Sequence, residues 1–152
     1  MGMTMDNDRI EREILIRAPL ERVWTMVTEP GWWVGEGDPT GVELREGQTV
    51  VSEHEGYGSF PMRIELIEPM RSITYRWATT FPGQEPREGN STLVQFTLAP
   101  EGEGTRLRVV ESGFASLDAP EETRRKSREG NIEGWTQEMD GFRERAEKPA
   151  TS

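Results

Sequence analysis

The feature that most constrains the fold is the stretch from residue 119 to residue 147, which predicts one long helix. In its second half the large apolar residues recur every three or four positions, at Ile132, Trp135, Met139 and Phe142. Residues 121–129 are nearly all charged, so we expect this half to be solvated. Asp118 is the predicted N-cap, with Glu121 three positions on and Pro120 in the first turn. This helix is the longest candidate to cover a sheet built by the rest of the chain.

Most of the remaining chain alternates apolar and polar residues, which is typical of half-buried strands. The predicted strands cover residues 9–17, 48–55, 60–66, 73–77, 92–98 and 107–111. The side chains expected to share one face of the third strand are Phe60, Met62, Ile64 and Leu66. A short helix over 18–27 has Pro19 at its first position, and glycines or prolines mark turns at 56–59 and 101–104 and a long loop at 80–90. An order of strand, helix, about six strands and long helix indicates an α+β fold.

Length and composition indicate one domain. A chain of 152 residues can bury roughly 70% of its unfolded surface in a single core. We expect residues 1–8 to be a disordered leader, 9–147 the domain and 148–152 a tail. The chain has no cysteine, which removes disulfides, thiolate catalysis and cysteine metal sites. Its one histidine and its carboxylates lack the spacing of metal ligands, so we expect no metal and no cofactor.

The charge balance disfavours two classes of partner. With 18 basic and 28 acidic residues the net charge is −10, which repels nucleic-acid phosphates and anionic lipid. No apolar run approaches the roughly 18 residues of a membrane-spanning helix, and residues 1–9 are too polar for a signal peptide. We therefore expect a cytoplasmic protein that binds neither nucleic acid nor membrane.

Two ionisable residues are candidate site residues. His54, the only histidine, lies on a predicted strand, where it could act as an acid, a base or a ligand anchor. The alternative is an ordinary strand histidine near a hairpin. Glu111 continues the alternation of Leu107 and Val109 toward the apolar side, where a carboxyl group becomes a general acid or a polar ligand anchor. The alternative is that the strand ends there and Glu111 reaches solvent or pairs with an arginine.

Large aromatic residues are the third candidate feature. Each of them is either a wall of a ligand pocket or ordinary core. The set comprises Trp24, Trp32, Trp33, Phe60, Tyr75, Trp77, Phe114, Trp135 and Phe142. Trp32 and Trp33 are adjacent in an apolar knot at 31–35, beside glycines and prolines, and cannot both be buried on one side. We expect one of them to close the mouth of a cavity and take Trp33 as the candidate.

Five short motifs in order carry a resemblance to a known family. They are ILIRAPLERVW at 14–24, IEPMRSITYRW at 67–77, GTRL at 104–107, ESGF at 111–114 and GW at 134–135. Together they resemble the START-like, polyketide-cyclase-like (SRPBCC) superfamily, in particular the branch of heat-shock-protein ATPase activator homologues. The similarity covers roughly residues 10–142, nearly the whole chain.

The resemblance implies a helix-grip fold. In that fold a curved antiparallel sheet of six to seven strands wraps the long C-terminal helix, and two short helices follow the first strand. It also implies a cavity for a small hydrophobic ligand between sheet and helix. The superfamily includes binders of lipids, hormones or polyketides, cyclases, hydrolases and co-chaperones, and no catalytic motif of the branch maps onto this sequence.

Our leading hypothesis is a protein that binds a small hydrophobic or aromatic molecule between the sheet and the gripped part of the helix, residues 132–142. The predicted walls of this site are Tyr75, Trp77, Phe96, Trp135 and Met139, with His54 and Glu111 as polar anchors and Trp33 at the mouth. One alternative is a cyclase or hydrolase of polyketide-like substrates that uses His54 or Glu111. The other is a co-chaperone-like interaction module, and a protein partner or homodimer stays open.

Overall fold

The computed structural model describes residues 9–28, 45–54, 58–78, 84, 86–87 and 89–148. Its two α-helices in this part are α1 (Leu20–Val27) and α2 (Glu121–Glu147), and a short 3-10 turn, η2 (Phe114–Ser116), precedes α2. The strands are β1 (Arg9–Ile16), β2 (Thr49–His54), β3 (Gly58–Glu68), β4 (Ser72–Trp77), β5 (Thr92–Glu101) and β6 (Gly104–Ser112). The predicted leader, the apolar knot at 31–35 and the second short helix expected after the first strand lie outside the described residues.

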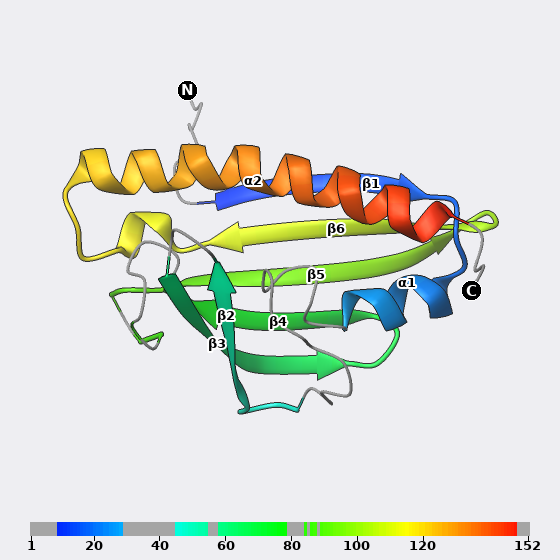
Figure 1. The fold of residues 1–152 in the computed structure, drawn as a ribbon, viewed down its shortest axis with the longest axis horizontal. Coiled ribbons are helices and arrows are strands. Elements are labelled where there is room, and N and C mark those ends of the chain that lie inside the picture. The colour runs from blue at the N-terminus through cyan, green and yellow to red at the C-terminus, as the bar shows by residue number, and fades with distance from the viewer. Residues whose placement is uncertain are drawn as a thin grey trace, which may run out of the picture.

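The described strands form one antiparallel sheet in the order β1-β6-β5-β4-β3-β2 (Figure 1). The first strand of the chain therefore pairs with the last, with Arg9 opposite Ser112 and Ile16 opposite Thr105. Along β6 the side chains alternate strictly between buried and partly exposed, because successive residues of a strand point to opposite faces. The buried face of the sheet lies against the helices, which confirms the predicted α+β class and helix-grip architecture.

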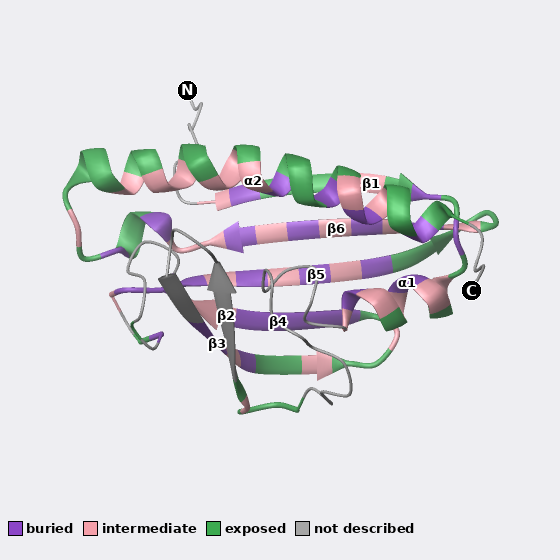
Figure 2. Ribbon diagram, viewed as in Figure 1, coloured by how far each residue is buried: buried purple, intermediate pink, exposed green. Residues whose placement is uncertain are grey.

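Both helices lie on that buried face. Figure 1 shows α2 running alongside β1 and α1 lying near β5, and both pairs are in contact. The residues of α2 that are buried recur at helical spacing, and they are Trp135, Met139, Phe142 and Ala146. The first half of α2 is mostly exposed, as its charged sequence predicts (Figure 2). The helix is thus packed only from its middle onward.

The start of α2 differs from the prediction. Pro120, not Asp118, occupies the N-cap position, and no side chain caps the helix. The backbone N–H of Asp118 donates instead to the carbonyl of Gly89, at 2.6 Å. The predicted capping box is therefore wrong, because Asp118 lies too far from the first turn of a helix that begins at Glu121.

A second difference lies in β3. The pairing of β3 with β4 shifts register between Ile64 and Leu66, which is the mark of a β-bulge. Beyond the bulge the faces exchange, so Leu66 is 42% exposed while Ile67 packs against the core. The prediction that Leu66 shares a face with Ile64 is therefore wrong.

The C-terminal end of α2 is held by a side chain of α1. The guanidinium of Arg22 donates from Nε to the carbonyl of Ala146 at 2.8 Å, and from Nη2 to those of Arg145 and Lys148 at 3.2 and 3.3 Å. The last carbonyls of a helix have no partner within it and carry its negative dipole end. A cation from α1 therefore both caps α2 and fixes its end against the sheet.

The opposite face of the sheet carries ion pairs, and no helix of the described residues packs on it. Arg106 of β6 pairs with Glu13 and Glu101, and Arg108 pairs with Glu11. These side chains are about a third to a half exposed, so each pair contributes little to stability. The arginines of β6 are therefore directed away from the helices.

Candidate functional site

Glu111 lies on the helix side of the sheet. It stands on β6 between Ile10 of β1 and Val94 of β5, and follows the buried residues Leu107 and Val109 in alternation. Its side chain is fully buried, at 0% exposure. The expectation that it points to the apolar side is confirmed, and the alternative of a strand end reaching solvent is wrong.

Four side-chain donors from three elements converge on this carboxylate. Oε2 accepts from Thr92 Oγ1 at 2.6 Å, from Trp77 Nε1 at 2.9 Å and from Asn131 Nδ2 at 3.1 Å. Oε1 accepts from Trp135 Nε1 at 2.8 Å and from the same Asn131 amide at 3.0 Å. Thr92 and Trp77 come from β5 and β4, while Asn131 and Trp135 come from α2. The carboxylate therefore joins the helix to two strands of the sheet.

All four donors are neutral groups. In the described part of the chain no arginine or lysine bonds to Glu111. Burial raises the pKa of Glu111, and the bonds from Thr92, Trp135, Trp77 and Asn131 offset part of that rise. The site thus holds a carboxylate whose charge is met by hydrogen bonds alone.

Beside the carboxylate, four aromatic rings form a closed cycle of contacts, which we call the aromatic quartet: Tyr75, Trp77, Phe96 and Trp135. Trp135 packs edge-on against Phe96 with ring centroids 5.6 Å apart, and Trp77 packs edge-on against Tyr75 at 5.8 Å. The cycle closes through Tyr75–Phe96 at 6.1 Å and Trp77–Trp135 at 6.3 Å. Such edge-to-face pairs stabilise beyond their buried area.

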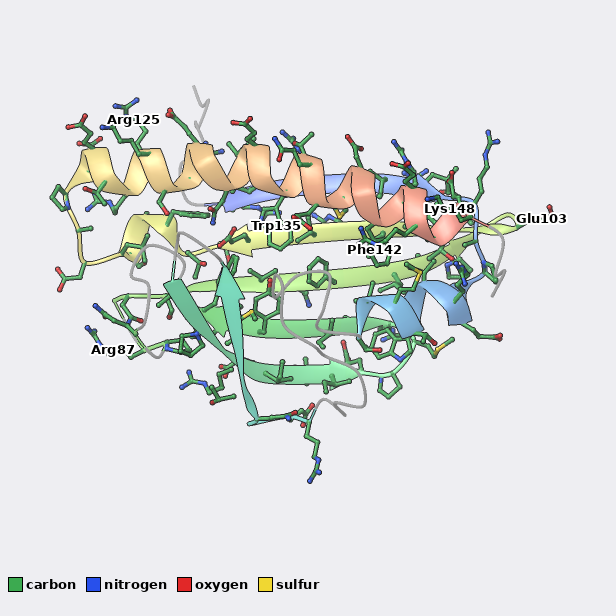
Figure 3. The ribbon with its side chains drawn as sticks, in the orientation of Figure 1. Arg87, Glu103, Arg125, Trp135, Phe142 and Lys148 are labelled. Atoms are coloured by element: carbon green, nitrogen blue, oxygen red, sulfur yellow. The ribbon has the colours of Figure 1, made fainter. Side chains whose placement is uncertain are left out.

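The rings of the quartet come from the same elements that supply the donors to Glu111. Tyr75 and Trp77 alternate on β4, Phe96 lies on β5, and Trp135 reaches down from α2, whereas Arg125 on the same helix points away from the sheet (Figure 3). Trp77 is the partly exposed member of the quartet, and the other three are buried. Trp77 therefore connects the buried cluster to the surface.

Tyr75 is a fully buried member of the quartet. Burial raises its pKa well above the ordinary value of 10.0, and the nearby charges of Glu111 and Glu138 add to the rise. The phenol therefore keeps its proton at neutral pH. The quartet presents no charge of its own, and of the two nearby carboxylates Glu111 is the buried one while Glu138 is exposed.

The structure brings together five of the eight predicted site residues: Tyr75, Trp77, Phe96, Glu111 and Trp135. Met139 lies one helical turn beyond Trp135 and is part of the buried core. The backbone of His54 is the last residue of β2, but its side chain is not among those described, and Trp33 lies outside the described residues. The ligand-binding roles assigned to all eight residues stay predictions.

Sequence reasoning missed Thr92 and Asn131. Thr92 is in phase with Val94 and Phe96 on β5, and Asn131 precedes Trp135 by one helical turn, so both interrupt an apolar pattern as Glu111 does. The signal that could have revealed them is a polar residue in the apolar pattern of each of three elements, β5, β6 and α2. Reading it required the strand register and the rotation of α2, which sequence alone does not supply.

Neither a metal site nor a membrane-spanning helix is found in the described residues. No group of three or more histidine, aspartate or glutamate side chains there could hold a metal ion. None of the helices there is both long enough and apolar enough to cross a bilayer.

A curved antiparallel sheet gripping a C-terminal helix, with an aromatic cluster between them, defines the START-like class of proteins. The family model described as activator of Hsp90 ATPase homolog 1-like protein matches residues 17–147, so the chain belongs to that family. A comparison with curated proteins gave no match.

Several solved structures share the fold. A protein from Mesorhizobium loti is 25% identical with a TM-score of 0.71, and the match covers 90% of this chain and 94% of that one. An Aha1 dimer from Colwellia psychrerythraea is 18% identical with a TM-score of 0.70, covering 94% and 98%. DynU16, described as a protein in the dynemicin biosynthetic locus, is 21% identical with a TM-score of 0.69, covering 90% of this chain and 46% of its own.

Proposed function

We propose that this protein binds a small hydrophobic or aromatic molecule between the sheet and α2, against the aromatic quartet. The observation that carries the proposal is the position of Trp77. It contacts two buried members of the quartet, donates its indole N–H to Glu111 and is itself partly exposed. A planar apolar ligand can therefore pack against Trp77 at the edge of this ring cluster without disturbing the core.

We place ligand binding ahead of a cyclase or hydrolase activity because of the bonds to Glu111. Both of its oxygens already accept hydrogen bonds from protein donors, at 2.6 to 3.1 Å. A general acid must instead present its proton to the substrate. These bonds support Glu111 as the group that sets the position of Trp77 and Trp135.

The first test is a titration of the purified protein with N-phenylnaphthylamine, a neutral aromatic probe, while tryptophan emission is recorded. We expect saturable quenching of the tryptophan emission. Trp77→Phe should weaken binding by about fivefold or more, because the smaller ring offers the ligand less contact area. Trp24→Phe is the matched control, since Trp24 lies on α1 outside the quartet, and its affinity should stay within about twofold of wild type.

The proposal fails if this probe and a panel of other apolar molecules leave the emission unchanged. It also fails if the two tryptophan variants lose affinity equally, because binding would then not involve the quartet.

The dimeric state described for the Colwellia protein supports the expectation of a homodimer. Light scattering of the purified chain will test it. A mass of one chain at all concentrations up to those of the binding experiments will contradict it.

A further inference from the structure

We propose that Glu111 makes the ligand site selective against anions, so that it accepts neutral or cationic apolar molecules and rejects carboxylates, sulfonates and phosphates. This inference rests on the ligand-binding function proposed above and names the chemical class of the ligand. It goes beyond that function because an apolar cleft by itself would accept the hydrocarbon part of an anionic amphiphile equally well.

The bonds around Glu111 suit the ionised carboxylate. The indole N–H groups of Trp77 and Trp135 can only donate, and both are within 2.9 Å of a carboxylate oxygen. Asn131 directs its amide N–H₂ at both oxygens. A carboxyl proton could be accepted only by the hydroxyl of Thr92, because the N–H groups of Trp77, Trp135 and Asn131 cannot accept a hydrogen bond. The geometry therefore favours the charged form.

The charge has no cationic partner among the described residues. The arginines of the same strand, Arg106 and Arg108, are paired with glutamates on the other face of the sheet. Arg12 crosses from β1 to α2 and donates to Thr136, while Arg128 crosses back and donates to the carbonyl of Arg9. The cations that span β1 and α2 are therefore bonded elsewhere, and the potential near Glu111 stays negative.

The two tryptophans bring this charge to the ligand. Each indole donates its N–H to the carboxylate, which increases the electron density of the ring face that a ligand would contact. A group stacked on Trp77 lies within about one indole width of the charge. Low polarity strengthens electrostatic interactions at such a distance, so an anionic group should bind at least about tenfold more weakly than its neutral counterpart.

The test compares two probes that share one ring skeleton: neutral N-phenylnaphthylamine and anionic anilinonaphthalene sulfonate. Dissociation constants are measured on wild type, Glu111→Gln and Glu133→Gln. We expect wild type to prefer the neutral probe by about tenfold or more. Glu111→Gln should reduce that preference to within about threefold, because its carbonyl keeps one acceptor and its charge is gone. Glu133→Gln removes an exposed charge of α2 and should leave the preference unchanged.

A second measurement keeps the test decisive if Glu111→Gln does not fold. The preference of wild type is measured again at about 0.5 M NaCl, where surface charges are screened beyond a few ångströms. A buried charge is screened much less, so the preference should persist, whereas repulsion by the net charge of −10 should vanish.

Three outcomes would overturn the inference. They are equal affinity for both probes, a preference that survives in folded Glu111→Gln, and a preference abolished by salt in wild type. In each of these cases the ligand-binding function itself stands. If neither probe binds, the proposed function fails and the inference fails with it.

Discussion

Glu111 places a carboxylate at the contact between β6 and α2, where an apolar side chain would be ordinary. Burying an ionised carboxylate is costly, and here four neutral donors offset the loss of water. Removing the carboxylate would leave the buried donors Thr92 and Trp135 without an acceptor, whereas the partly exposed Trp77 and Asn131 can turn to water. The charge therefore defines how α2 sits on the sheet, at a cost in stability.

That cost predicts how stability depends on pH. The pKa of Glu111 is raised above its ordinary value of 4.5, with burial as the first cause. As pH rises past 4.5, the unfolded state loses the proton of Glu111 while the folded state still retains it. The contribution of Glu111 to the free energy of unfolding therefore falls as pH rises. Glutamine does not titrate. The free energy of unfolding of wild type relative to Glu111→Gln should therefore fall between about pH 4 and about pH 7.

Urea denaturation of both proteins across this range will measure the difference. The contributions of Glu11 and Glu101 have the opposite sign, because arginine hydrogen bonds lower their pKa values, and they cancel between the two proteins. A difference that stays constant or grows with pH would show that Glu111 does not titrate as its burial requires.

At the scale of elements, polar contacts hold α2 near its middle and at its C-terminal end. The carboxylate network around Trp135 is the first of these contacts, and Arg22 bound to the last carbonyls of the helix is the second. Arg12 and Arg128 also join α2 to β1, while the charged first half of the helix is mostly exposed to solvent (Figure 2). Loss of Arg22 should therefore loosen the C-terminal end without moving the aromatic quartet.

We expect Arg22→Ala to lower the free energy of unfolding by about 1–2 kcal/mol, because it removes a cation and its hydrogen bonds from a helix C-terminus. Amide hydrogen exchange in the last turn of α2 should become faster, and that of Trp135 should not. Arg145→Ala is the control, since it removes an exposed arginine side chain from the same turn and keeps the backbone carbonyl that accepts from Arg22, and its effect should stay within about 0.5 kcal/mol. Equal effects of both substitutions would contradict the role given to Arg22.

The elements themselves were largely predictable, and the reasons for the exceptions are physical. Alternation located the strands, and helical spacing located the buried residues of α2. The bulge between Ile64 and Leu66 could not be predicted from the sequence. One extra residue exchanges the buried and exposed faces of β3 without changing its composition. Asp118 failed as a cap because several residues before a helix have suitable side chains, and the backbone path decides among them. For the site, alternation oriented Glu111, whereas its partners depend on contacts distant in sequence.

At the scale of the whole molecule, the net charge of −10 acts against the compact state. The exposed ion pairs on the outer face relieve this repulsion only locally. We expect the free energy of unfolding at neutral pH to rise by roughly 1 kcal/mol or less when NaCl is raised from about 0.02 M to about 0.3 M. Near the isoelectric point of about 4.7 the rise should disappear, because salt then only weakens the ion pairs. Thermal or urea unfolding at both pH values will decide it, and an equal rise at both would point away from charge repulsion.

The pairing of β1 with β6 has a consequence for how the protein is made. Arg9 lies opposite Ser112, and Arg22 bonds to carbonyls at the end of α2, so β1 and α1 are synthesised well before the elements they contact. A ribosome adds residues from the N-terminus, and contacts between distant residues form slowly. β1 therefore has no strand to pair with until residues 104–112 have emerged, and α1 has no helix to cap until α2 is complete. The growing chain exposes the apolar side of β1 until β6 has been made, and this part of the fold closes only once α2 has followed.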